Sequence, residues 1–437
     1  MIADQIQTGL DLLFELDTVD AVTMFLFFLL FDLPRYGLTV VVVGAMHVRR
    51  SFRRAVPSQT LARVADDHPL VSVVIAGHNE ENAIEACVRS LREQSLMHAA
   101  PGSIELVVID DGSTDLMRAV ASRLEKEGVI AKAISLDVRG GKSAAINLGI
   151  SVCRAPFIAI VDADCSFDRD AIEKILAYFD DPAVGAVGGN IGLRNADVSL
   201  TTRAQAIEYL LSIGMGRQAS DAFGTLTIVS GAFGVFRREA LESVGGYDVE
   251  VGEDADLTLK LRRAGWRIRF AADAWCLTDV PDNLPALFSQ RMRWDRGAIA
   301  LWARKHRGVF NPFRIGFAWR DVVGSLDPLL FDVGLSAVFV GYLGWLFWSF
   351  GSFAWVLLVA IFPIYLIVGL VSLLAATIVS ARPNQIGLLP YLPVYVLLGG
   401  FLMRFLRLVA VFGEIALRSS YRDPYVPRRV MDQVDIT

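Results

Sequence analysis

The stretch FIAIVDAD, residues 157–164, decides the fold, because an apolar run ends there in two carboxylates, Asp162 and Asp164. A short run of branched and aromatic residues bounded by polar ones is typical of a buried strand in a parallel sheet. In open α/β sheets the ligand crevice lies at the carboxyl ends of the strands, so both acids would face a pocket. Their oxygen atoms suit Mg²⁺ or Mn²⁺. The alternative is a solvated turn that contains two aspartates without a function.

The residues before this strand alternate between apolar runs and helical patterns. Apolar runs at 71–76 (VSVVIA), at 105–110 (ELVVID) and near 131–136 are each followed by a polar turn and then a helical pattern. Alternation of this kind predicts a parallel, doubly wound sheet. Acidic residues follow the first, second and fourth of these strands, so the acids would share one edge of the sheet.

Composition indicates a membrane protein with a large globular insert. The 437-residue chain is 54% hydrophobic, with a mean hydropathy of +0.45, which is too high for an ordinary soluble enzyme. The excess lies at 21–48 and from about 329 to 412, whereas 57–305 has the composition of a soluble domain.

The net charge of -5 gives no indication of a nucleic-acid surface. The four cysteines show no CxxC spacing, which predicts neither a zinc site nor a disulfide framework.

Charged residues around the apolar segment 21–48 predict its orientation. Acids precede it in 1–20, and arginines follow it at positions 49, 50, 53 and 54. By the positive-inside rule, 1–20 is extracytoplasmic, 21–48 is a transmembrane helix, and the domain at 57–280 lies in the cytosol. Within the segment, Asp32 and Arg35 are three residues apart, so we expect them to pair on one helix face.

The C-terminal part is divided by the same criteria. An amphipathic, basic and Trp-containing stretch at 281–322 is typical of helices at the bilayer interface. About three apolar segments follow in 323–413, and a basic tail occupies 414–437. One plus three spans would place this tail outside, against the positive-inside rule. Prolines and arginines interrupt the last apolar stretch, at 387–412, so we expect it to be re-entrant or bent and the tail to be cytosolic.

Two nucleotide-binding motifs are excluded. The first turn of the domain, AGHNEEN, lacks the pattern G-x-G-x-x-G, so a dinucleotide site has no support. The segment RGGKS at 139–143 ends like a phosphate-binding P-loop, but Leu136 stands where the first glycine of that loop would have to be. The chain is therefore not a P-loop NTPase.

Six short motifs stand in a fixed order along the predicted domain. They are HNEE at 78–81, DDGSTD at 110–115, GGKSAAIN at 140–147, DAD at 162–164, GED at 252–254 and QRMRW at 290–294. In this order the chain resembles the membrane-integrated family 2 glycosyltransferases: cellulose, hyaluronan, chitin-oligosaccharide and bacterial poly-β-1,6-N-acetylglucosamine synthases. The resemblance covers roughly residues 70–310 and the flanking apolar segments. It implies a GT-A-like α/β fold, whose doubly wound, mostly parallel sheet lies in the cytosol with transmembrane helices on either side.

The resemblance also implies how a UDP-sugar donor is held. Asp162 and Asp164 would hold Mg²⁺ or Mn²⁺ at the diphosphate, where the metal neutralises the leaving group. Asp111 matches the acid on the uracil and ribose side, and Glu80 lies in the same pocket; Asp111 as a plain turn residue is the alternative. Lys142 would reach a phosphate from the start of a helix. The first turn reads GHNE where the family more often has Pro and Tyr before Asn and Glu, which leaves the uridine contacts open.

On the acceptor side, Asp254 matches the general base that takes the proton of the attacking hydroxyl, and direct displacement would invert the anomeric configuration. Glu253 would orient this loop. Within QRMRW, Gln290 and Trp294 match acceptor-binding residues, and Arg293 matches a residue that contacts the diphosphate. The alternatives are a helix cap for Asp254 and an interfacial anchor for Trp294.

The predicted function is that of a processive, inverting glycosyltransferase of the cell (inner) membrane. It would transfer a sugar, N-acetylglucosamine first among the candidates, from a UDP-sugar to a growing β-linked polysaccharide and couple synthesis to export. The expected partners are membrane lipids and accessory export proteins. No nucleic-acid partner is expected. The first alternative is non-processive transfer to a lipid or lipid-linked acceptor, which the QRMRW motif disfavours. The second is a scaffold or transport protein with an inactive domain, which the intact acids disfavour.

Overall fold

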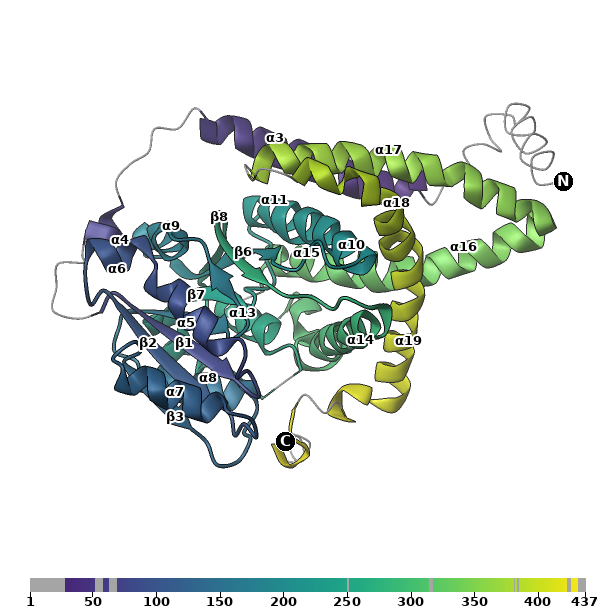
Figure 1. Cartoon of the computed structure of the whole chain (residues 1–437). Helices are drawn as coiled ribbons and strands as arrows, with labels where there is room; N and C mark the ends of the chain where they lie inside the picture. Colours follow the sequence, from purple (N-terminus) through teal and green to yellow (C-terminus); the bar gives the residue numbers. More distant parts are fainter. Residues whose placement is uncertain are drawn as a thin grey trace.

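The computed structural model describes residues 28–51, 58–62, 69–249, 251–313, 317–380, 382, 385–422 and 426–430. The predicted extracytoplasmic segment 1–20 and the start of the predicted helix 21–48 lie outside these residues. Figure 1 shows an α/β domain beside a layer of long helices, to which α3 (Leu33–Ser51) and α17 (Ala354–Ser380) belong.

One mixed sheet of eight strands forms the core of the domain. The strands are β1 (Val71–Gly77), β2 (Ile104–Asp110), β3 (Lys132–Ser135), β4 (Phe157–Asp162), β5 (Ser166–Phe167), β6 (Val184–Leu193), β7 (Phe233–Arg237) and β8 (Arg267–Thr278). Their order in the sheet is β3-β2-β1-β4-β7-β6-β8-β5. The first four neighbours in this order run parallel, whereas β7 is antiparallel to both β4 and β6. The predicted α/β class is confirmed.

The acid-bearing strand ends lie level with one another at one edge of the sheet. β1 pairs in register with β2 as far as Gly77 and Asp110, and with β4 as far as Ala76 and Asp162. Every residue of β2 is buried, as are all residues of β4 before Asp162, so the two strands hold their acidic ends firmly. The prediction that these acids share one edge is confirmed.

The second half of the sheet departs from the prediction. The predicted strands end with β4, whereas the structure adds β6, β7 and β8; within the apolar stretch 226–238 only β7 is extended. Aromatic rings take the place of side chains in β6: a Cβ at Gly189 would lie 2.0 Å from Phe233 Cδ1, and one at Gly185 would lie 2.7 Å from Trp266 Cβ. These glycines allow the close packing. Because glycine has a low strand propensity, they also make β6 difficult to predict from the sequence.

Helices cover both faces of the sheet. Along β1, Val73 and Ile75 belong to the hydrophobic cluster on one face, and Val74 belongs to the cluster on the other. The helices of the domain are α4 (Gln59–Ala62), α5 (Ile84–Arg92), α6 (Ser95–Ala99), α7 (Met117–Lys126), α8 (Lys142–Val152), α9 (Ala171–Leu176), η3 (Ala177–Asp180), α10 (Leu200–Glu208), the π-helix η4 (Tyr209–Gly216), α11 (Arg217–Ala222), α12 (Arg238–Val244) and α13 (Glu253–Arg263).

Helices also make up the part of the chain that follows the domain. They are α14 (Leu284–Ala300), η5 (Leu301–Lys305), η6 (Arg307–Phe310), α15 (Trp319–Asp327), η7 (Pro328–Gly334), α16 (Leu335–Phe350), η8 (Gly351–Phe353), α17, η9 (Gln385–Tyr391), α18 (Leu392–Tyr395), η10 (Val396–Leu402), α19 (Met403–Leu417) and η11 (Ser419–Arg422); η1 (Phe28–Asp32) precedes α3. Two helical stretches, Trp319–Ser380 and Gln385–Leu417, are long and apolar enough to cross a membrane. The 3-10 turn η8 divides the first stretch.

The last helical stretch changes direction before the C-terminal tail. It passes through η9, α18 and η10, and Figure 1 shows α19 leaving the layer of long helices to run along the domain. Beyond it, Val426 and Pro427 lie against Gly141, and the Arg429 guanidinium donates a hydrogen bond to the carbonyl oxygen of Arg139. The described tail residues therefore lie beside the domain, and the cytosolic side of the tail stays a prediction.

The predicted pair of Asp32 and Arg35 is wrong. Asp32 is buried and accepts hydrogen bonds from Arg404 Nη2, at 2.9 and 2.8 Å, and from Tyr365 Oη, at 2.5 Å. Arg35 instead lies 3.8 Å from Asp327. Because Asp32 is enclosed between helices, its charge is compensated by groups from the facing helices α17 and α19 rather than by a half-exposed neighbour on its own helix.

Candidate active site

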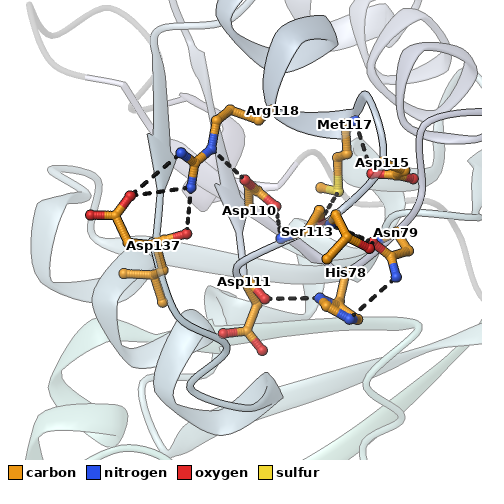
Figure 2. Close-up of polar contacts among 11 residues, drawn as sticks. His78, Asn79, Asp110, Asp111, Ser113, Asp115, Met117, Arg118 and Asp137 are labelled. Atoms are coloured by element: carbon orange, nitrogen blue, oxygen red, sulfur yellow. Dashed lines mark hydrogen bonds and ion pairs between the residues drawn. The ribbon is translucent and has the colours of Figure 1, made fainter.

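Hydrogen bonds tie the first two strand-to-helix turns together, as Figure 2 shows. His78 Nδ1 lies 2.9 Å from the carbonyl oxygen of Asp111. Asn79 has a positive φ of 63°, which Asn tolerates better than most residues, and its Oδ1 accepts a hydrogen bond from the Thr114 amide at 2.8 Å. The turn HNEE is thereby fixed, with Glu80 at the carboxyl ends of the strands.

The Asp111 carboxylate shapes the turn before α8. Its two oxygens accept hydrogen bonds from the amides of Gly140, at 2.6 Å, and Gly141, at 2.8 Å. Gly141 has a φ of 90°, which favours glycine, and α8 begins at the next residue. The structure thus gives Asp111 a definite contact within the chain, and its contact with a uridine stays a prediction.

Lys142 joins the two halves of the site. Its Nζ lies 2.5 Å from Asp162 Oδ1, at the end of β4, and 3.6 Å from Glu253 Oε1, at the start of α13. Gly231 makes room for this side chain, because a Cβ there would lie 2.9 Å from Lys142 Nζ. The sequence predicts a phosphate-facing Lys142 but gives no sign of its link to Glu253.

Negative charge accumulates around the end of β4. Burial raises the pKa of Glu80 to about 7, with further increases from the charges of Asp164 and Asp162. Burial and the Asp162 charge also raise the pKa of Asp164, although Thr278 Oγ1 donates a hydrogen bond to Asp164 at 3.0 Å. Burial and repulsion between neighbouring acids thus both oppose the charged form of these carboxyl groups, which positive charge would favour.

A divalent cation would supply the missing positive charge. Among the described residues no group of three or more His, Cys, Asp or Glu side chains is arranged to hold a metal. Mg²⁺ commonly takes one or two protein carboxylates and completes its shell with waters and phosphate oxygens of a substrate. Asp162 and Asp164 therefore fit a cation that is shared with a phosphate-bearing ligand.

Asp254 lies in the first turn of α13, beside the predicted helix start. Its Oδ1 accepts a hydrogen bond from the Ala255 amide at 2.8 Å, whereas its Oδ2 lies 3.4 Å from the Gly231 amide nitrogen, a long contact. Glu253 is buried, and burial raises its pKa while the Lys142 charge opposes that increase. Asp254 thus has one weakly bonded oxygen available to a ligand.

The QRMRW segment lies in α14 and brings Gln290, Arg293 and Trp294 onto one helix. Arg291, which is not predicted as a site residue, is buried and donates a hydrogen bond to Glu208 Oε2 at 2.8 Å. Its guanidinium lies 4.3 Å from the centroid of the Trp294 ring, and Trp294 is 43% exposed. Gln290 Oε1 is buried and has no hydrogen-bond partner among the described residues.

A glycine contact fixes α14 against the loop that carries Asp254. A Cβ at Gly297 would lie 2.7 Å from the carbonyl oxygen of Val251. Gly252, which has a φ of 93° and directly precedes α13, packs against the backbone of Gly297. The helix that carries QRMRW and the turn that carries Asp254 are therefore held at a set distance. A glycine within a helix of larger residues is the only sign of this contact in the sequence.

A buried polar cluster ties α13 to η5. Asp256 is fully buried, and its carboxylate lies 2.7 Å from His306 Nε2 and 2.9 Å from Lys305 Nζ. Arg263 Nη1 lies 3.1 Å from His306 Nδ1. Because a guanidinium only donates, Nδ1 accepts and Nε2–H donates to Asp256. This cluster holds α13, and Asp254 with it, against the helices that follow the domain.

Comparison with known proteins supports the predicted family over part of the chain. The model of glycosyl transferase family 2 matches residues 72–245. This part of the chain, less than half of its length, is similar to family 2 glycosyltransferase domains. The predicted family and class of enzyme are confirmed at this level. The matched range includes Glu80, Asp111, Lys142 and both aspartates at the end of β4, whereas Asp254 and QRMRW lie beyond it.

Similar proteins include two bacterial synthases. The poly-beta-1,6-N-acetyl-D-glucosamine synthase of Staphylococcus epidermidis is 30% identical over 261 residues, which are 59% of this chain and 61% of that protein. The synthase of the same name from Staphylococcus aureus (strain MSSA476) is 31% identical over 229 residues, 52% of this chain and 54% of that protein. The chain thus spans little more than half the length of these relatives.

A solved structure shows the same fold over most of the chain. The mannosyltransferase PcManGT from Pyrobaculum calidifontis, in complex with GDP-Man and Mn2+, superposes with a TM-score of 0.58 at 19% sequence identity. The match covers 90% of this chain and 99% of that one. The arrangement of the glycosyltransferase domain with its flanking helices is therefore shared with a solved protein.

The first prediction concerns cation binding. Protons and a cation compete for the same carboxylates, so we expect the affinity of the purified protein for Mn²⁺ to fall as the pH is lowered through about 7, where Glu80 takes up a proton. Paramagnetic resonance of free Mn²⁺ measures this affinity. Glu80→Gln should weaken the pH dependence in this range. Equal Mn²⁺ affinity above and below this pH would show that Glu80 does not influence cation binding at the end of β4.

The second prediction concerns the glycine contact. Gly297→Ala places a methyl group 2.7 Å from the carbonyl oxygen of Val251, so the Asp254 loop must move. We expect slower sugar transfer and a loss of stability of about 1–3 kcal/mol, typical of overpacking. Thermal unfolding in detergent and a transfer assay measure both. Gly341→Ala is the control, because a Cβ at that helical position meets nothing within 4 Å. Identical behaviour of the two variants would refute the contact.

Proposed function

We propose that this protein transfers N-acetylglucosamine from a UDP-sugar to the end of a β-linked polysaccharide, with inversion at the anomeric carbon. The similarity to two poly-β-1,6-N-acetylglucosamine synthases supports the class of substrate. Because these matches cover only part of each relative, the complete reaction is argued from the geometry of this chain.

One observation carries the proposal: Lys142 contacts both Asp162, at 2.5 Å, and Glu253, at 3.6 Å. Asp162 lies at the strand end where a diphosphate and its cation would bind, and Glu253 directly precedes Asp254. A phosphate at Lys142 therefore lies beside the residue that would activate the acceptor. Donor and acceptor sites in direct contact are what a single displacement requires.

On the donor side, the bond between the anomeric carbon and the β-phosphate oxygen breaks, and negative charge grows on the departing UDP. Lys142 and the N-terminus of α8 would stabilise that charge. Mg²⁺ or Mn²⁺ bound by Asp162 and Asp164 would neutralise the diphosphate oxygens. Glu80 and Arg293 complete the proposed donor site.

On the acceptor side, a hydroxyl oxygen of the terminal sugar forms the new bond to the anomeric carbon. Its proton passes to Asp254, whose Oδ2 has only a long contact in the chain. Attack from the face opposite UDP converts an α-linked donor into a β-linked product. The exposed face of Trp294 offers an apolar platform for the terminal sugar, and Gln290 Oε1 offers it an acceptor.

The flanking helices support a membrane-bound enzyme with its domain in the cytosol. Arginines that directly follow the first apolar segment favour this orientation, and the described tail residues lie on the side of the domain. Asp295 of α14 accepts a hydrogen bond from Arg407 of α19 at 3.3 Å. This bond joins the helix that carries QRMRW to the last apolar stretch. This contact supports synthesis coupled to export by the membrane part of the protein.

A panel of donors tests the function directly. Purified protein in vesicles is incubated with UDP-sugars and GDP-mannose in the presence of Mg²⁺ or Mn²⁺, and linkage-specific hydrolases identify the product. We expect a β-linked N-acetylglucosamine polymer from UDP-N-acetylglucosamine. A product of one added sugar on a lipid would favour the non-processive alternative. The absence of transfer from every UDP-sugar would overturn the proposal.

Replacement of the proposed base gives a sharper prediction. Asp254→Asn keeps the shape of the side chain but removes the proton acceptor, so we expect transfer to fall by about 10²–10⁴-fold. UDP affinity, measured by calorimetry, should stay near that of the wild type, because Lys142 and the aspartates of β4 are untouched. Turnover like that of the wild type in this variant would refute the assignment of Asp254.

A further inference from the structure

Thr278 contacts the cation site from a different part of the sheet. It is the last residue of β8, and its Oγ1 donates a hydrogen bond to Asp164 Oδ2 at 3.0 Å. The carbonyl oxygen of Asp279 lies farther from the same hydroxyl, at 3.4 Å. A hydroxyl has one proton to donate, so the shorter contact, to a charged carboxylate, is the stronger bond.

Strand pairing brings Thr278 and Asp164 together. β8 pairs with β6 so that Thr278 lies opposite Leu193, and with β5 so that Leu277 lies opposite Ser166. Ser166 follows Asp164 closely along the chain. The position of Thr278 beside Asp164 is therefore set by two strand ladders rather than by a loop.

The two acids at the end of β4 are held in different ways. Asp162 is held by a positive charge, because Lys142 Nζ lies 2.5 Å from its Oδ1. Asp164 is held at Oδ2 by the neutral hydroxyl of Thr278, and at Oδ1 it has a contact of 3.6 Å with the Cys165 thiol, a weak donor. A neutral donor orients a carboxylate without cancelling its charge. The charge of Asp164 is therefore left for an added cation.

A nearby arginine does not cancel this charge either. Arg194 Nη2 donates a hydrogen bond to the main-chain carbonyl oxygen of Asp164 at 3.0 Å, and it lies 2.6 Å from Asp279 Oδ2. The charge of Arg194 is thus compensated by Asp279. Arg194 and Thr278 hold the backbone and the side chain of Asp164, and neither places a positive charge on its carboxylate.

We propose that Thr278 is a positioning residue for the cation: its hydroxyl sets the orientation of the Asp164 carboxylate toward Mg²⁺ or Mn²⁺. This inference rests on the proposed cation site and on the proposed transferase function. Hydrogen-bond partners of metal ligands typically contribute about 10- to 100-fold to metal affinity, because they hold the ligand in its binding orientation.

Variants of Thr278 test this role through metal affinity. Thr278→Val removes the hydroxyl and keeps the shape, whereas Thr278→Ser keeps the hydroxyl. Thr377→Val is the control, because the Thr377 hydroxyl donates to the carbonyl oxygen of Leu373 within α17. Paramagnetic resonance of free Mn²⁺ measures the affinity of each purified protein for Mn²⁺, alone and with UDP. We expect Thr278→Val to weaken Mn²⁺ binding by about 10-fold or more, and the other two variants to stay within about threefold of the wild type.

Transfer kinetics separate a positioning role from a general loss of structure. If Thr278 acts through the cation, Thr278→Val needs about 10-fold more Mn²⁺ for half-maximal transfer, while kcat at saturating Mn²⁺ returns to that of the wild type. A lower kcat at saturating Mn²⁺, with the Mn²⁺ affinity of the wild type, would overturn the proposed role.

The remaining outcomes also decide the matter. Unchanged Mn²⁺ affinity in Thr278→Val would overturn the role of Thr278, and so would an equal loss in Thr278→Ser. If Thr278→Val does not fold, Thr278→Ala, which also removes the donor, is judged by the same results. Wild-type protein that binds no Mn²⁺, with or without UDP, would refute the cation site and this inference with it. Wild-type protein that binds Mn²⁺ but transfers no sugar would instead refute the proposed function, and the Mn²⁺ affinities would still decide the role of Thr278.

Discussion

The ion pair of Lys142 with Asp162 and Glu253 is the contact on which the rest of the site depends. Asp162 ends the central parallel strand, whereas Glu253 begins the helix that carries Asp254. Without a cation between them, these two acids would repel one another. Glu80 and Asp164 add further negative charge at the same end of the sheet. Lys142 therefore holds the site together in the absence of ligands, and a diphosphate with its own cation can take over that role.

The helices that follow the domain complete the site. α14 touches the Asp254 loop through Gly297, where no larger residue fits, and the buried Asp256 cluster ties α13 to η5. From α14 the contact of Asp295 with Arg407 leads to α19 and the apolar stretch beyond. The position of the proposed base is thus set partly by helices outside the family match, which ends at residue 245. This arrangement would link the proposed sugar transfer to the apolar helices that follow the domain.

Residues with a local signature were predictable from the sequence. The strand end at Asp162 and the helix start at Lys142 follow from hydrophobic pattern and turn chemistry. Contacts between residues far apart in the sequence were not predictable. Asp32 pairs with Arg404 of another helix, and the glycines of β6 leave room for aromatic rings of distant elements.

The most direct test is the structure of the protein with UDP and Mn²⁺, determined by electron cryomicroscopy in lipid. The account predicts that the diphosphate lies between Lys142 and the end of β4, with Mn²⁺ bound by Asp164 or Asp162, and that Lys142 Nζ contacts a phosphate oxygen. Asp254 should then face the open side, where the anomeric carbon would lie. UDP bound elsewhere on the domain, or Lys142 and Asp162 still paired with the nucleotide remote from both, would contradict the account.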